Sequence, residues 1–393
     1  MTRLSKTEPP DIAETRFFHH KKPLSLCCGK SLPEFTLAYE TWGELNADRS
    51  NAILVFHAKT GSQHAAGINK SVPGLGVQWN EECQTGWWDG FIGPGKAFDT
   101  RNHYIICANF LGGCYGSTGP ASTNPDTGKP YGSDFPIIEF SDIVESQLLL
   151  LQHLGIGKLH AAAGASIGGL LALSLATRHP GSASRLVLLA TGLSVTPLQR
   201  ILNFEQIIAI ESDPDFQGGN YYPGKGPLKG LQLARMIAHK TFISLEALAE
   251  RSRQEVVTPS EHVGNYILSS PFESYMLHQG KKFPERFDAN TYLLIMQAWQ
   301  HFDLAASAGT KTIQQALARL AALPVVLFSI DSDVCFYPEE QDILFQSLTS
   351  AGAKVEKIAV HSRKGHDSFL IDPDLYTPKI QEFLENDPPK GKN

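Results

Sequence analysis

The stretch around Ser166 constrains the fold of this chain more than any other. A short apolar run leads into Gly164-Ala165-Ser166-Ile167-Gly168, and alanines and leucines at helical spacing follow as far as Arg178. This pattern predicts a strand, a sharp turn and a helix, with the serine on the turn. Glycines at both ends of the pentapeptide let neighbouring backbone approach where a Cβ atom would clash. The sequence therefore indicates a serine nucleophile at a strand–helix junction.

Strand and helix patterns alternate over much of the chain. An alternating run at 32–39 predicts an early antiparallel strand. Continuous apolar runs predict strands buried on both faces, as in a parallel sheet, at 51–56, 104–108, 185–190, 324–329 and 355–360. Helices are expected at 141–155, with Ser141 as its N-cap, and at 378–385. Residues 72–100, rich in Gly, Pro and Trp, predict an irregular surface loop with packed aromatic residues. We expect an α/β fold with a doubly wound, mostly parallel sheet.

The pattern of apolar residues changes after residue 191. Residues 192–304 hold no buried-strand pattern, and helical patterns cover 197–212, 230–242, 245–255 and 289–302. This indicates a helical insertion within the α/β core. The predicted organisation is a first core part at 16–191, a helical lid at 192–304 and a second core part at 305–386.

Composition argues against several classes of protein. The 393 residues are 42% apolar and 19% charged, with a net charge of −6 and no block of lysines and arginines. This argues against nucleic acid or an anionic membrane as the main partner. No apolar run is long enough to span a membrane, and the segment Met1 to Phe17 lacks the apolar stretch of a signal peptide. Because the six cysteines form no CxxC pattern, we expect a cytoplasmic protein with free thiols and no metal.

A serine nucleophile needs a base, and the base needs an acid to orient it. In enzymes of the α/β-hydrolase fold the chain order is nucleophile, acid, histidine. Here the late strand at 324–329 runs into two aspartates, Asp331 and Asp333. The residues alone leave both open as the acid that serves Ser166.

The histidine should follow the last strand, at 355–360. Two histidines compete there, His361 and His366. Gly365 favours a tight, exposed turn at His366, whereas His361 directly abuts the strand and is interpreted as structural. We therefore predict His366 as the base.

Two backbone amides should stabilise the oxyanion of an acyl-transfer reaction. One belongs to Ile167, at the start of the helix after the serine. The other should come from the loop at 57–61, after the strand at 51–56. The residues predict acyl transfer through serine, and they leave open whether water or another nucleophile resolves the acyl-enzyme.

Several specific stretches of the chain, from about residue 37 to the last helix, resemble the homoserine O-acyltransferase family. They are His57-Ala-Lys-Thr-Gly61, His64-Ala-Ala-Gly67, Gly86-Trp-Trp-Asp89, Gly93-Pro-Gly-Lys-Ala-Phe-Asp99, Leu111-Gly-Gly-Cys-Tyr-Gly-Ser-Thr-Gly-Pro120, Asn124-Pro125, Phe135-Pro136, Asp213-Pro-Asp-Phe-Gln-Gly-Gly219, Arg286-Phe-Asp-Ala-Asn290 and Gly365-His-Asp367. The glycine-rich run and the run ending at Asp99 are the most specific.

The resemblance implies an α/β-hydrolase fold with a helical lid, and a homodimer formed through that lid. It implies ping-pong transfer of an acetyl group from acetyl-CoA to the γ-hydroxyl of L-homoserine, early in methionine biosynthesis. Acetyl-CoA is then a co-substrate, and no cofactor is expected.

The family's site residues fall on matching positions of this chain. The triad falls on Ser166, Asp333 and His366, since Ser332-Asp333 followed by Phe336-Tyr337-Pro338 matches the family pattern. The resemblance implies that Arg235 binds the substrate carboxylate and that Asp367 holds its amino group.

The chain also departs from the family pattern at the predicted site. Lys59, whose amide is the second predicted oxyanion donor, replaces the usual leucine, and Phe242 replaces a tyrosine. Thr60 and Phe242 complete the predicted substrate-binding residues. Ala165 and Ile167 replace glycine and methionine. The alternatives are a succinyl-CoA donor or an L-serine acceptor, a plain esterase, and a non-catalytic interaction protein that would lack a triad residue.

Overall fold

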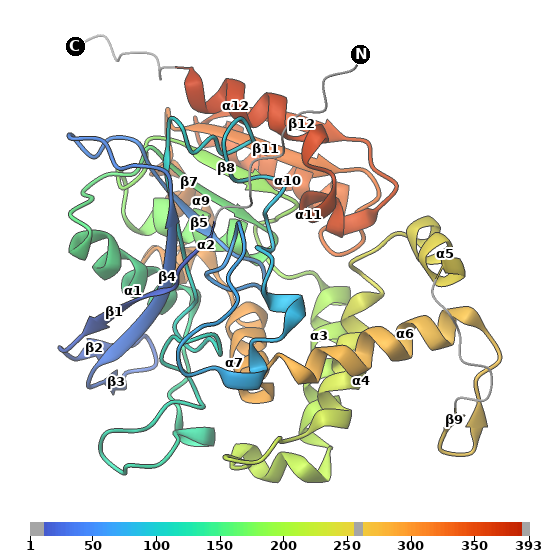
Figure 1. Cartoon of the computed structure of the whole chain (residues 1–393). Helices are drawn as coiled ribbons and strands as arrows, with labels where there is room; N and C mark the ends of the chain where they lie inside the picture. The colour runs from blue at the N-terminus through green and yellow to red at the C-terminus, as the bar shows by residue number, and fades with distance from the viewer. Residues whose placement is uncertain (1–11, 255–261, 387–393) are drawn as a thin grey trace, which may run out of the picture.

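The computed structural model describes residues 12–254 and 262–386, and it is built around one eight-stranded sheet (Figure 1). The strand order is β1-β4-β6-β5-β7-β8-β11-β12. The bounds are β1 Arg16–His20, β4 Phe35–Trp42, β5 Ala52–Phe56, β6 Tyr104–Ala108, β7 Ala161–Ala165, β8 Leu186–Leu189, β11 Pro324–Ile330 and β12 Lys354–Val360. β4 is antiparallel to both β1 and β6, and every pair from β6 to β12 is parallel. The predicted doubly wound α/β sheet and its early antiparallel strand are confirmed.

Alternate side chains of the parallel strands enter two hydrophobic clusters, one on each face. Leu54, Leu188 and Leu327 belong to one cluster, whereas Val55, Leu189 and Phe328 belong to the other. The first face is covered by α1 (Phe140–His153), α2 (Ile167–Arg178), α9 (Ile313–Ala318) and α10 (Pro338–Ser350). Residues 87–98 and α12 (Thr377–Glu385) cover the second. Two-sided burial explains why these strands read as continuous apolar runs.

The segment at 72–100 is irregular, and the prediction that its aromatic residues pack is confirmed. Trp88, Phe91 and Phe98 are fully buried in the second cluster. The indole of Trp88 donates to the carbonyl of Phe369, 2.7 Å away. Aromatic rings can form a core without regular secondary structure when their polar atoms find partners.

The N-cap predicted for α1 is wrong. The capping residue is Glu139, whose backbone N–H donates to the Asp142 carboxylate in a capping box. Ser141 lies inside the helix, with its hydroxyl 3.1 Å from the thiol of Cys27. Two acidic side chains satisfy the free amides of the first turn, so the helix begins earlier than the serine indicated.

Between β8 and β11 the chain forms a helical layer that projects from the sheet (Figure 1). Its helices are α3 (Pro197–Glu211), α4 (Leu228–His239), α5 (Leu245–Gln254), α6 (Pro271–Lys282) and α7 (Ala289–Gln300). A small hairpin, β9 (His262–Val263) with β10 (Tyr266–Ile267), precedes α6. The sequence patterns missed α6, although Ser270, Pro271 and Glu273 form a capping box with proline in its first turn. The domain boundaries at 191/192 and 304/305 stay a prediction.

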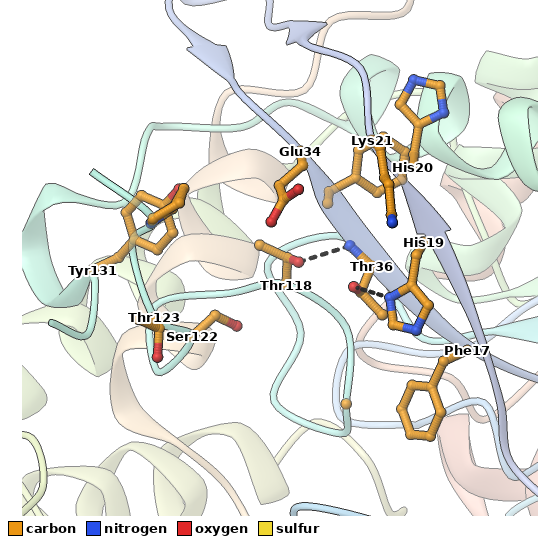
Figure 2. A pocket seen from close by; sticks show the side chains of 13 residues that line it. Phe17, His19, His20, Lys21, Glu34, Thr36, Thr118, Ser122, Thr123 and Tyr131 are labelled. Carbon is orange, nitrogen blue, oxygen red and sulfur yellow. Dashed lines mark hydrogen bonds between the residues drawn. The ribbon is translucent and has the colours of Figure 1, made fainter. Parts of the chain in front are cut away.

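The remaining short elements are β2 (Leu24–Ser25), β3 (Ser31–Leu32), α8 (Leu304–Ser307) and α11 (Ser368–Ile371). A cavity of about 420 Å³ lies at the β1 edge of the sheet, and its walls include Phe17, Lys21 and Glu34 (Figure 2). None of its lining residues belongs to the predicted site. Among the helices within 12–254 and 262–386, none has the length and apolarity needed to cross a membrane.

Candidate active site

The predicted triad residues gather at one edge of the sheet. β7, β8, β11 and β12 are consecutive, parallel and in register, so their carboxyl ends lie together (Figure 1). Ser166 directly follows β7, Asp333 follows β11 and His366 follows β12. This edge is where open α/β sheets bind ligands.

Ser166 sits on the predicted sharp turn between β7 and α2. Its φ of 57° and ψ of −128° are a strained conformation for a residue with a side chain, and the residue is 6% exposed. A Cβ atom on Gly164 would collide with the carbonyl of Gly168, and one on Gly168 would collide with the carbonyl of Phe56. Both glycines are therefore required for α2 to pack against the ends of β5 and β7.

The structure pairs each aspartate with one histidine. Asp331 Oδ2 lies 2.8 Å from His361 Nδ1, but that imidazole is 83% exposed. Asp333 Oδ2 lies 2.7 Å from His366 Nδ1, with the two side chains 0% and 3% exposed. Only the second pair is shielded from water, where a carboxylate orients an imidazole strongly.

Asp333 is itself held in one orientation. Its Oδ1 accepts hydrogen bonds from the amides of Cys335 and Phe336, at 2.8 and 2.9 Å. The other oxygen is left to accept from Nδ1 of His366. This arrangement fixes the proton on Nδ1 and leaves Nε2 of the ring as the proton acceptor. The rings of Phe336 and Phe369 lie 5.7 and 5.1 Å from the imidazole.

Two backbone amides near Ser166 are free. Ile167 is the first residue of α2, so its N–H has no acceptor within the helix. Gly168 stands against the carbonyls of Phe56 and His57, which places the loop at 57–61 beside this turn. Within the described residues, the amide of Lys59 donates to no acceptor. Both amides predicted for an oxyanion hole are thus available.

The side chain of Lys59 is buried under the helical layer. Its Nζ donates to Tyr292 Oη at 2.9 Å and to Gln206 Oε1 at 3.2 Å, and it lies 4.6 Å from the ring centre of Tyr292. In the part of the chain that the structure describes, it forms no ion pair with a carboxylate. Burial lowers the pKa of Lys59 to about 7. Thr60, the next residue, is half-buried in the same loop.

The predicted substrate residues lie beside His366. The ring of Phe242 is 6.4 Å from that imidazole, and Arg235 lies 5.2 Å from the same ring of Phe242. The amide of Asp367 donates to the carbonyl of Phe242 at 2.8 Å. Burial lowers the pKa of Arg235 and raises the pKa of Asp367, and the opposite charge of each partly offsets the shift in the other.

The loop that carries His366 is fastened to the helical layer. The hydroxyl of Ser244 donates to the carbonyl of Arg363. Gly365 has a φ of +73°, and a Cβ atom on it would come within 2.5 Å of the Ser244 amide nitrogen. A residue without a side chain is needed there for the two loops to touch.

Sequence reasoning missed three polar residues of this region. Gln206 on α3 and Tyr292 on α7 hold the Lys59 ammonium, and the Tyr292 hydroxyl donates to Gln206 Oε1 at 2.5 Å. Arg286 donates to Tyr115 Oη at 3.0 Å and adds a second positive charge near Arg235. Arg286 belongs to a motif that the sequence singled out, whereas Gln206 and Tyr292 carried no signal among helical residues. Within 12–254 and 262–386, no group of three His, Cys, Asp or Glu residues is placed to hold a metal ion.

Comparisons with known proteins show the fold family and the relatives of this chain. Residues 53–359 match the α/β hydrolase fold family. The homoserine O-acetyltransferase of Methanococcus vannielii is 41% identical over 371 residues, which cover 94% of this chain and 73% of that protein. The homoserine O-succinyltransferase of Aromatoleum aromaticum is 42% identical over 368 residues, covering 93% of this chain and 95% of that protein.

Two solved structures have the same fold over nearly their whole length. The homoserine O-acetyltransferase from Bacillus anthracis superposes with a TM-score of 0.85 at 28% identity, covering 96% of this chain and 99% of that one. Esterase E22 gives a TM-score of 0.84 at 27% identity, covering 95% and 100%.

Proposed function

Because this chain belongs to the homoserine O-acyltransferase family of α/β-hydrolase-fold proteins, we propose that it moves an acetyl group from acetyl-CoA to the γ-hydroxyl of L-homoserine. The observation that carries the proposal is the buried Asp333–His366 pair at the sheet edge where Ser166 follows β7. The reaction would serve methionine biosynthesis.

The first half-reaction loads the serine. His366 Nε2 takes the proton of the Ser166 hydroxyl as Oγ attacks the thioester carbonyl of acetyl-CoA. The amides of Lys59 and Ile167 stabilise the tetrahedral oxyanion. Collapse breaks the carbon–sulfur bond, CoA leaves as the thiol with the proton from His366, and the acetyl group stays on Ser166.

The second half-reaction transfers the group to the amino acid. His366 takes the proton of the homoserine γ-hydroxyl, whose oxygen attacks the acetyl ester, and then returns that proton to Ser166. Arg235 would bind the α-carboxylate, and Asp367 would bind the α-ammonium group. In the described chain neither side chain forms an ion pair with another residue, which supports this role.

The test is thiol release from acetyl-CoA by the purified protein with L-homoserine, L-serine or no acceptor. Release that requires homoserine is expected, and Ser166→Ala should lower it by at least about 10⁴-fold without unfolding the protein. Release without any acceptor would identify a hydrolase, the class of enzyme for which esterase E22 is named. Near-normal turnover of Ser166→Ala would refute the assignment.

Succinyl-CoA as donor is a second candidate, favoured by the environment of Lys59. Its ammonium lies buried behind the predicted oxyanion amide without a carboxylate partner among the described residues, and one curated relative is a homoserine O-succinyltransferase. The free carboxylate of a succinyl group would supply that partner.

This candidate makes a pH-dependent prediction. Because burial lowers the Lys59 pKa to about 7, the ammonium loses its proton above that pH, and KM for succinyl-CoA should rise. KM for acetyl-CoA should not follow it. Lys59→Met should remove the dependence, whereas Lys96→Met, at a lysine paired with Asp89, should leave it. An unchanged donor preference in Lys59→Met would exclude a role for this side chain.

We also propose that two copies pair through the helical layer. Exposed apolar side chains form one face of α3, at Leu198, Ile201, Phe204 and Ile208. An apolar groove of about 560 Å³ lies between α4 and α6, lined in part by Leu233, Met236, Phe272 and Met276. Sedimentation should give a dimer that Phe204→Glu weakens. Val77→Glu, at an apolar residue 95% exposed outside this layer, should not, and a monomeric wild type would contradict the proposal.

A further inference from the structure

His57 follows β5 and is buried against the loop that carries the Lys59 amide. The residue is 2% exposed, and its ring stacks on Phe110 with centres 3.5 Å apart and planes inclined by 16°. The amide of Phe110 donates to Nε2 of His57 at 3.3 Å. The imidazole therefore joins the loops that follow β5 and β6.

The hydrogen bonds of His57 define its tautomer. Nε2 accepts a hydrogen bond from the Phe110 amide, so it carries no proton of its own. Nδ1 lies 2.8 Å from the carbonyl oxygen of Ala58, and a carbonyl can only accept. His57 is therefore a neutral imidazole that donates from Nδ1. Burial, which lowers its pKa to about 4, keeps it neutral at physiological pH.

The carbonyl that His57 holds belongs to the same peptide group as the Lys59 amide. A trans peptide is planar, and its C=O and N–H bonds point in opposite directions. Fixing the direction of the Ala58 carbonyl thus fixes the direction of the Lys59 N–H. The Gly61 amide donates to the same oxygen at 2.9 Å, so both lone pairs of this carbonyl are engaged.

We propose that His57 is the positioning residue of the oxyanion hole, because its Nδ1–H orients the peptide plane whose N–H end is the free amide of Lys59. A donor fixed before the reaction stabilises a developing charge better than one that must reorient. The hydrogen bond to the carbonyl also polarises the peptide, which strengthens the N–H as a donor. This inference rests on the proposed acyl transfer.

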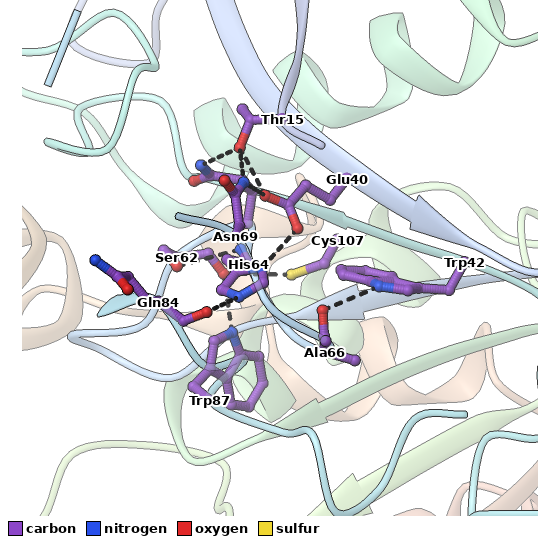
Figure 3. A network of polar contacts seen from close by, with 12 residues as sticks. Thr15, Glu40, Trp42, Ser62, His64, Ala66, Asn69, Gln84, Trp87 and Cys107 are labelled. Atoms are coloured by element: carbon purple, nitrogen blue, oxygen red, sulfur yellow. Dashed lines mark hydrogen bonds and ion pairs between the residues drawn. The ribbon is translucent and has the colours of Figure 1, made fainter. Parts of the chain in front are cut away.

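The far end of the same loop is fixed independently (Figure 3). His64 Nδ1 lies 2.7 Å from Glu40 Oε2, and Nε2 of the ring lies 3.0 Å from the carbonyl of Gln84. Thr15 and Asn69 donate to the other oxygen of Glu40 at 2.6 and 2.8 Å. Because this network anchors the loop, the loss of the His57 hydrogen bond leaves the Ala58 carbonyl held by the Gly61 amide alone, which loosens one peptide plane without releasing the whole segment.

Two substitutions of His57 test whether its Nδ1–H donor, and not the bulk of its ring, is what matters for kcat. Asparagine places an N–H donor as far from Cα as Nδ1 of histidine, so His57→Asn can still donate to the Ala58 carbonyl. The amide of His57→Gln lies one bond further out, at the distance of Nε2. We expect kcat of His57→Gln to fall about 10- to 100-fold with little change in KM, and kcat of His57→Asn to stay within about threefold of wild type.

The controls distinguish positioning from a structural role. His103, a buried histidine immediately before β6, is the matched control, and His103→Gln should lower the melting temperature without changing kcat. Where His57→Gln does not fold, His57→Phe replaces it, since a phenyl ring keeps the stack on Phe110 and removes both nitrogens. Wild-type kcat in either variant, or an equal loss in His57→Asn, would overturn the inference. Absent thiol release from the wild type would refute the proposed function instead.

Discussion

The substitution Asp333→Asn tests the proposed base most directly. Asparagine has the shape of aspartate but only one oxygen. That oxygen is needed by the amides of Cys335 and Phe336, which otherwise stay buried without acceptors, at a cost of about 1–3 kcal/mol each. The asparagine NH₂ must then face Nδ1 of His366, which becomes an acceptor. The ring proton moves to Nε2, and His366 can no longer take the proton of Ser166.

A base held in the wrong tautomer costs about 10⁴-fold in kcat, or about 5.4 kcal/mol at 1.36 kcal/mol for each tenfold. The melting temperature should stay close to wild type, because the shape and both amide hydrogen bonds are retained. Thiol release from acetyl-CoA with L-homoserine measures kcat. Asp331→Asn, in the exposed pair with His361, is the matched control and should keep wild-type turnover. A loss below tenfold in Asp333→Asn, or an equal loss in Asp331→Asn, would refute the reasoning.

The remaining predictions concern stability. Burial lowers the folded pKa of His57 to about 4, whereas an unfolded imidazole titrates near about 6.5. The unfolded chain therefore binds a proton at a higher pH than the folded chain does. Denaturant melts should show that the free energy of unfolding drops by about 3 kcal/mol as the pH falls from about 6.5 to about 4. The drop should be smaller in His57→Asn. Gly365→Ala should cost about 2 kcal/mol or more, since φ is +73° and Ser244 blocks the Cβ, and calorimetry should show a lower melting temperature. Glu40→Gln should cost about 3–5 kcal/mol in urea unfolding, because it breaks the buried pair with His64.

Two of these stability predictions have a matched control variant at a less crowded or more exposed position. Gly309→Ala, at a φ of +65° with open space around the Cβ, should cost less than Gly365→Ala. Glu145→Gln, in a partly exposed pair with His179, should cost less than Glu40→Gln. Equal losses within either pair would show that backbone strain or charge alone, and not packing, sets the cost.

Much of the fold could be predicted because its signals are local. The strand, turn and helix around Ser166 are encoded by adjacent residues, and two-sided burial makes each parallel strand an apolar run. Helix α6 was missed because polar and charged residues interrupt its apolar pattern, while a capping box marks its start. The packing of the aromatic residues at 87–98 could be expected from their type, but irregular backbone carries no periodicity that shows which face of the sheet they cover.

The sequence by itself determined the sheet, the turn that carries Ser166, and the few aspartates and histidines that could serve this serine, since these depend on spacing along the chain. The residues favoured His366 and the resemblance favoured Asp333, but only the tertiary structure decided the burial of each pair: Asp333 lies buried with His366, whereas Asp331 and His361 are exposed. Only the fold brought Gln206 and Tyr292 to Lys59, and joined His57 to Phe110 across two loops. The physical reason is that burial and hydrogen-bond partners come from segments far apart in sequence, and packing alone sets the distance between them.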